Sequence, residues 1–225
     1  LLALPLRFPA QGWKPSGWSA PVPKPGEEIC ECDRGMMLRT TTFYGLWACF
    51  FIGCLSGLMA ISIAKPVGTE IGVEAGLATL LVGFFAIFNG FGRPVFGSLT
   101  DRITPRNTAL VSFVLISLAS VALWISPTIP VYILAFAILW ACLGGWLAIA
   151  PTATGTYFGT CDYPRCYGIV FLAYGAGAIA GPLLAGFIKD STGNYMGVFP
   201  YILVLAILGF FLGWILIKPP RRQKA

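Results

Sequence analysis

Six uninterrupted apolar segments constrain the fold of this chain more than any other feature of its sequence. Each is about twenty residues long, which is enough helix to cross about 30 Å of hydrocarbon. The strands of a transmembrane barrel would instead alternate in polarity over about ten residues. Charged residues make up only 11% of the chain, whereas a soluble domain has about 25%. We therefore predict an all-α membrane protein with spans near Thr41–Ala64, Glu74–Thr100, Thr108–Ser126, Val131–Thr154, Tyr167–Ile188 and Met196–Ile217.

The regions that flank these spans are polar. Residues 1–40 are rich in proline and lack periodicity, which indicates a cytoplasmic loop or tail with a short helix near Asp33–Arg39. Residues 41–217 form the six-helix transmembrane part, and residues 218–225 form a basic cytoplasmic tail. Residue 1 is Leu, and no signal-peptide pattern follows it. We therefore expect the chain to begin within a larger protein.

The distribution of basic residues predicts the orientation of the chain in the membrane. Of 15 Lys and Arg residues, twelve lie in the N-terminal region, the second-to-third connection, the fourth-to-fifth connection and the tail. Only Lys65 and Lys189 lie on the opposite side, and Arg93 lies within a span. The positive-inside rule then places both termini in the cytoplasm of a cell-membrane protein. The net charge of +6 is explained by this orientation, so we expect no nucleic-acid partner.

Residues that commonly hold cofactors are scarce. The chain has no histidine, and its seven cysteines form no CxxC motif. Cys30 and Cys32 lack two further ligands at a suitable spacing for a metal site. A membrane-embedded enzyme would need a cluster of His, Cys or carboxylates facing the bundle, and none is evident. We therefore predict no metal, no cofactor and no enzymatic activity.

Arg93 is a permanent cation at membrane depth. Its guanidinium cannot lose its proton, so it needs an anion, a dipole or water as a partner. Asn89 precedes it by four residues and shares its helix face. Glu74 and Asp101 are both at helix ends, so the spans offer no fixed acidic partner. An unpaired charge at this depth indicates a functional site, and we predict that Arg93 and Asn89 bind an anionic substrate.

The connection after the second span also carries charge. Gly97 is followed by Asp101, Arg102 and Arg106 at the cytoplasmic end. An acidic residue between helices and next to two arginines can form a clamp that breaks when the helices move. An ordinary solvated loop is the alternative.

These residues resemble a known family signature. The pattern G-x-L-x-D-R-x-x-x-R is similar to the loop between the second and third helices of a six-helix repeat in the major facilitator superfamily. Thr104 stands where the usual pattern has Gly, and Pro105 where it has Arg. The segments FYGLWACFFIGCLSGLM, NGFGRPVFGSLTDR, APTATGTYFGT and YGIVFLAYGAGAIAGPLLAG resemble the oxalate/formate antiporter family, relatives of the monocarboxylate transporters.

The resemblance covers nearly the whole chain but only the C-terminal half of such transporters. It implies a six-helix half of a twelve-helix fold, with residues 1–40 as the central cytoplasmic loop and a missing N-terminal half as partner. It also implies that Arg93 binds the substrate carboxylate, with Asn89 at a polar substrate-site position. Tyr174 stands where the dicarboxylate exchanger has a lysine in the corresponding segment, so one cation remains, which suits a monocarboxylate. Trp146 resembles an aromatic cavity position, and packing is the alternative for both aromatic residues.

We therefore predict alternating-access transport of a small organic monocarboxylate such as lactate or formate, by proton symport or anion exchange. A dicarboxylate (oxalate)/formate antiporter and a transporter of a different solute remain alternatives. A non-transporting six-helix membrane protein is a remote third alternative.

Overall fold

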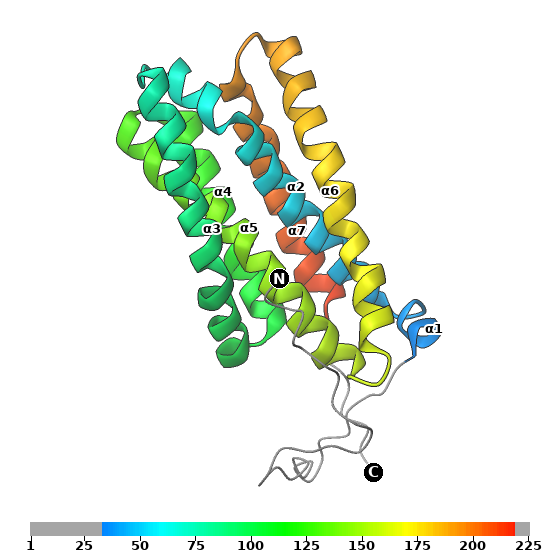
Figure 1. The fold of residues 1–225 in the computed structure, drawn as a ribbon. Coiled ribbons are helices and arrows are strands. Elements are labelled where there is room, and N and C mark those ends of the chain that lie inside the picture. Colours follow the sequence, from blue (N-terminus) through cyan, green and yellow to red (C-terminus); the bar gives the residue numbers. More distant parts are fainter. Residues whose placement is uncertain (1–32, 219–225) are drawn as a thin grey trace, which may run out of the picture. The chain divides into compact units, whose positions relative to one another are not determined.

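The computed structural model describes residues 33–218, and within them every long element is a helix (Figure 1). The elements are α1 (Arg34–Met37), α2 (Thr41–Glu70), α3 (Ala75–Ile103), α4 (Pro105–Ile125), α5 (Ile129–Phe158), α6 (Tyr163–Thr192), the 3-10 helix η1 (Tyr195–Gly197) and α7 (Val198–Leu216). Most of the predicted N-terminal loop, including Cys30 and Cys32, and nearly all of the basic tail lie outside the described residues.

Helices α2 to α7 are each long and apolar enough to cross a membrane, which confirms the six predicted spans. The predicted short helix corresponds to α1. Several helices are longer than their predicted spans: α2 continues through Lys65 and Pro66 to Glu70, and α5 and α6 extend by two to four residues at each end. Pro66 therefore does not end the helix, contrary to the usual effect of an interior proline.

Side-chain caps set several of the helix ends. The hydroxyl of Thr40 accepts a hydrogen bond from the Phe43 amide at 3.2 Å and begins α2. The carboxylate of Glu74 accepts from the amides of Gly76 and Leu77, at 2.8 and 3.0 Å, and begins α3. These two hydrogen bonds lower the pKa of the Glu74 carboxyl, since they stabilise its ionised form.

The turn between α3 and α4 is strained. Thr104 has φ 86° and ψ 150°, and it is the one residue other than glycine with a positive φ among residues 33–218. This region of backbone space suits glycine, since a Cβ is disfavoured there. The Gly that the family pattern has at this position is therefore explained by the geometry of the turn.

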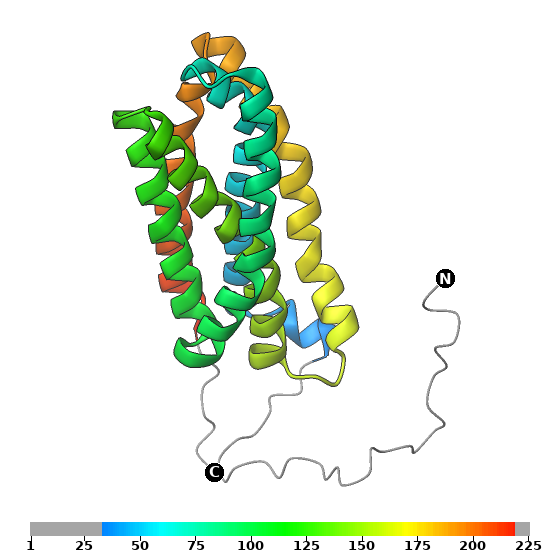
Figure 2. The same ribbon diagram turned by 60° about the vertical axis from the view of Figure 1, so that its left-hand side comes forward.

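The helices differ in how much of their surface this chain covers. In the most apolar stretch of each helix, 67% of the residues are buried in α2 and in α5, against 17% in α3 and 28% in α6. Helix α3 packs mainly on α5, and α6 mainly on α2, while α7 packs on α4 and α2 (Figures 1 and 2). Helices α2 and α5 thus form the interior, and α3 and α6 keep broad uncovered faces.

Candidate functional site

Arg93 and Asn89 lie one turn apart on α3, the least covered of the spanning helices. Arg93 is ten residues before the end of α3, or about 15 Å along its axis, which is half the thickness of a bilayer core. The Arg93 side chain is exposed and that of Asn89 is half-buried. Helix α3 continues through Pro94 without interruption, so the residues on both sides of Arg93 are helical.

The Asn89 amide is fixed by the neighbouring helix. Its Nδ2 donates a hydrogen bond to the main-chain carbonyl of Trp140 on α5 at 3.3 Å. Asparagine carries two amide hydrogens and a carbonyl oxygen, so this one bond leaves further capacity for a ligand. The bond sets the orientation of Asn89 on the face that it shares with Arg93.

Arg93 has no such partner. Within residues 33–218 its guanidinium forms neither an ion pair nor a hydrogen bond, since the ion pairs found there are Arg165–Asp162 and Lys189–Asp190. The five donors of the Arg93 guanidinium form a planar fork that matches a carboxylate in bidentate geometry. This arrangement can bind an anion.

Two glycines bring α3 and α5 into main-chain contact at this level. A methyl group added to Gly144 of α5 would collide with the main-chain oxygen of Asn89, and one added to Gly92 of α3 would collide with the oxygen of Ala141. Such close approach is typical of helix packing in lipid. Adjacent small residues such as Gly144 and Gly145 are compatible with this packing, but the sequence alone does not identify Trp140 and Ala141 as the residues of α5 that contact α3.

Tyr174 lies on α6, which shares no extensive packing with α3. Its half-buried ring stacks on Phe171, with the ring centroids 5.2 Å apart. This pair ends a row of rings on α6 in which Tyr163, Tyr167 and Phe171 follow one another at 5.7 and 5.6 Å. The structure therefore brings Asn89 and Arg93 together on one face but leaves Tyr174 on a separate helix.

Trp146 lies in the interior of the bundle. Its side chain is fully buried, and it occupies the space left by Gly53 of α2. Its ring lies 6.1 Å from Phe50 and 5.3 Å from Phe113, measured between centroids. These contacts favour the packing alternative for Trp146 over contact with a substrate.

The charged residues at the end of α3 and the start of α4 do not pair with one another. Asp101 and Arg102 are exposed and form no ion pair with residues 33–218. Arg106 instead donates from Nη2 to the Trp214 carbonyl at 2.6 Å, near the end of α7, and its amide donates to the Tyr157 hydroxyl at 3.2 Å. A cation on the last carbonyls of a helix is favourable. Arg106 thus joins α4 to α7 and α5, while Gly97 approaches Ala148 of α5.

Comparison with known proteins agrees with this arrangement of helices. The profile of the Major Facilitator Superfamily matches residues 46–225. The fold and the match define a multi-pass membrane protein built as one half of a major facilitator fold. The chain belongs to the major facilitator superfamily.

Several individual transporters are similar to this chain in sequence. The chain is 31% identical over 198 residues to the "Oxalate:formate antiporter" of Oxalobacter formigenes, which covers 86% of this chain and 45% of the relative. It is 27% identical over 144 residues to the "Uncharacterized MFS-type transporter YhjX" of Escherichia coli (strain K12), covering 63% and 36%. It is 24% identical over 138 residues to "Monocarboxylate transporter 12" of Xenopus laevis, covering 60% and 30%. The chain spans less than half the length of these relatives.

Proposed function

We propose that this chain forms the substrate-binding half of a secondary transporter for a small organic monocarboxylate, in which Arg93 binds the carboxylate. The observation that carries the proposal is the Arg93 guanidinium, which is exposed at mid-span without a partner among residues 33–218. A cation in this position is costly unless an anion reaches it. The names of two relatives, an oxalate:formate antiporter and a monocarboxylate transporter, agree with an anionic substrate.

Asn89 assists Arg93 in this proposal. Because one amide hydrogen is held by the Trp140 carbonyl, the remaining hydrogen and the carbonyl oxygen of Asn89 can contact a carboxylate or hydroxyl of the substrate. Tyr174 can add a hydroxyl only if substrate binding closes the distance between α6 and α3. Trp146 acts through packing.

The proposed movement follows from the uncovered faces. The exposed side of α3 and the Tyr174 side of α6 face a second six-helix half, and a substrate site lies between the two halves near mid-membrane. Helix α3 moves together with α5, because main-chain contacts join them at Gly92 and Gly144. The cytoplasmic end of this unit carries Gly97, Asp101, Arg102 and Arg106. Asp101 is free there to pair across the interface between the two halves.

In the same proposal, both termini lie in the cytoplasm of a cell-membrane protein.

The coupling is symport or exchange. In the described spans, aspartate and glutamate occur only at helix ends, so a proton carrier next to Arg93 is not provided by residues 33–218. Exchange of a dicarboxylate for formate is the second candidate function, and the 31% identity to the oxalate:formate antiporter favours it. A single cation beside the substrate supports a monoanion instead.

Uptake of labelled lactate, formate and oxalate into vesicles tests the proposal with the full-length protein. We expect saturable uptake of a monocarboxylate, exceeding that of oxalate. Arg93→Lys keeps the charge but loses the planar fork, so KM should rise about tenfold or more. Equal transport by the Arg93→Lys variant would rule out the carboxylate fork, and saturable uptake of oxalate alone would favour the second candidate.

A further inference from the structure

A second surface feature lies away from Arg93, where α6 and α7 diverge near their connection. There they leave an apolar groove of about 420 Å³, and Met59 of α2 lies at its base. The walls come from both helices: Leu184, Phe187, Ile188, Tyr201, Val204 and Leu205. The outer wall residues are open, since Phe187 is 71% exposed and Val204 64% exposed.

A cation and an anion stand at the end of this groove. Lys189 and Asp190 follow directly after the groove residue Ile188, and their side chains are 42% and 79% exposed. The Lys189 Nζ lies 3.8 Å from an Asp190 carboxylate oxygen and 5.9 Å from the centre of the Tyr195 ring. Both charges are therefore close together and open to the surroundings.

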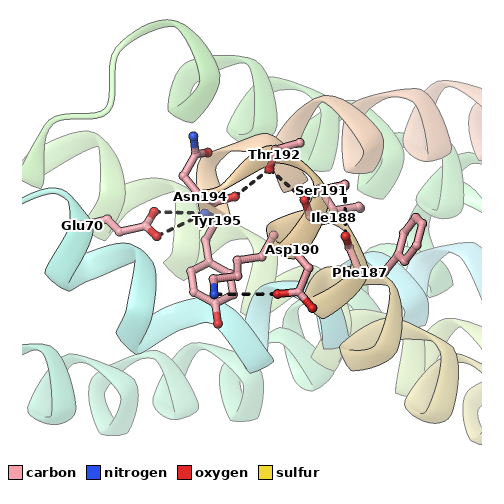
Figure 3. Close-up of polar contacts among 9 residues, drawn as sticks. Glu70, Phe187, Ile188, Asp190, Ser191, Thr192, Asn194 and Tyr195 are labelled. Carbon is pink, nitrogen blue, oxygen red and sulfur yellow. Dashed lines mark hydrogen bonds and ion pairs between the residues drawn. The ribbon is translucent and has the colours of Figure 1, made fainter.

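The loop beside these charges is held in place by α2. Both carboxylate oxygens of Glu70 accept from the Tyr195 amide, at 3.2 and 3.1 Å (Figure 3). The Thr192 hydroxyl donates to the carbonyls of Ile188 and Asn194, at 2.8 and 3.0 Å, which fixes the end of α6 in the same view. Glu70 is thus engaged within the fold, whereas Lys189 and Asp190 form an exposed ion pair with each other, which a ligand carrying both charges can replace.

We propose that this site binds one phospholipid with a zwitterionic headgroup. One acyl chain lies in the groove between α6 and α7, the phosphate contacts Lys189, and the headgroup ammonium contacts Asp190. Lipid tails are as apolar as the groove, so occupation of the groove alone gives little selectivity. The paired charges supply it, because an anionic headgroup without an ammonium would meet the Asp190 carboxylate with no compensating contact.

The lining of the groove suits an acyl chain, because both walls and the base are apolar. In this proposal the chain lies between Leu184 of α6 and Val204 of α7.

Native mass spectrometry of the full-length protein tests the proposal. The protein is supplied with equal amounts of phosphatidylethanolamine, phosphatidylcholine and phosphatidylglycerol. We expect one retained zwitterionic lipid per protein, with a preference of about two- to five-fold over phosphatidylglycerol, the range of an exposed ion pair. Asp190→Asn should remove this preference, and Lys189→Ala should lower retention of all three lipids.

A groove-filling variant completes the test. Val204→Trp should abolish the retained lipid, whereas Val114→Trp, at an exposed valine of α4 outside the groove, should keep it. Equal elution volume and melting temperature of the two variants establish that both are folded. Retention without headgroup preference, absence of a retained lipid, or retention by folded Val204→Trp would each overturn the proposal. Should Val204→Trp not fold, the Asp190→Asn result alone decides, and an unchanged preference rejects the site.

Discussion

Arg93 lies on α3 and Arg106 on the next helix, α4, yet only Arg106 has a hydrogen-bond partner for its guanidinium within residues 33–218. Arg106 is half-buried, and its guanidinium donates to the Trp214 carbonyl near the end of α7. Arg93 is exposed on α3 and has no partner among residues 33–218. A guanidinium that is used by the fold contributes to stability. One that the fold leaves unpaired at mid-span is available to a ligand, which is why we assign binding to Arg93 and a structural contact to Arg106.

The largest effect should come from Arg93→Gln. It removes the charge and the bidentate fork, and charge-assisted hydrogen bonds contribute about 1.5–3 kcal/mol each, so transport should fall about 100-fold or more. The melting temperature should stay within error of wild type, because no side-chain hydrogen bond or ion pair within residues 33–218 is lost. The measurement is initial uptake in vesicles at matched protein density. A large fall in melting temperature would instead place Arg93 with Arg106 as a structural residue.

Gly144→Ala should mainly reduce stability. The added methyl collides with the main-chain oxygen of Asn89, and overpacking costs about 1–3 kcal/mol. Thermal unfolding in detergent measures the change. Gly90→Ala is the matched control, since open space surrounds that position, and it should be neutral or slightly stabilising. Equal melting temperatures for the two variants would contradict the close approach of α3 and α5.

Thr104→Gly, in the turn before Arg106, should raise the free energy of unfolding. Relief of the backbone strain at φ 86° is worth about 1–3 kcal/mol, whereas loss of the Thr104 cap on Asn107 costs only about a few tenths of a kcal/mol. Transport should be unchanged in KM. A lower melting temperature for Thr104→Gly would show that the turn is not strained.

Arg106→Gln should lower stability and leave transport unchanged, which is the reverse of the result expected for Arg93→Gln. Loss of the bond to the Trp214 carbonyl should cost about 1 kcal/mol of stability and leave substrate KM unchanged. Arg102→Gln is the control, because Arg102 is exposed and forms no ion pair within the described residues. If Arg106→Gln raised KM and kept the melting temperature, the contrast between the two arginines would fail.

Glu74 should give the smallest effect, and one that depends on pH. Its pKa is lowered in the folded state, so its contribution is present above the unfolded pKa of about 4.3 and is lost as pH falls through the folded pKa. Glu74→Ala should therefore lower the melting temperature slightly at pH 7, and the difference should shrink below about pH 4. A difference that grew on acidification would contradict the capping role.

The sequence predicted the spans well because their apolar length is a local property. The existence of α2 to α7 follows from hydropathy, and the pairing of Asn89 with Arg93 follows from helical spacing. The extension of α2 through Lys65 and Pro66 was missed, since a basic residue before a proline is typical of a helix end.

Contacts between helices could not be predicted in this way. The bond from Asn89 to the Trp140 carbonyl and the one from Arg106 to Trp214 join residues 51 and 108 positions apart. They depend on the rotation of each helix about its axis, which hydropathy does not specify. The burial of Trp146 against Gly53 has the same origin, because either face of α5 is apolar enough to be buried.

Equilibrium binding of labelled lactate, formate and oxalate to the purified full-length protein tests the central claim most directly, because it does not depend on coupling or on transport rate. The account predicts saturable binding of a monocarboxylate by wild type and by Arg106→Gln, and none by folded Arg93→Gln in the same concentration range. Binding by Arg93→Gln with wild-type affinity would contradict the assignment of the carboxylate site to Arg93.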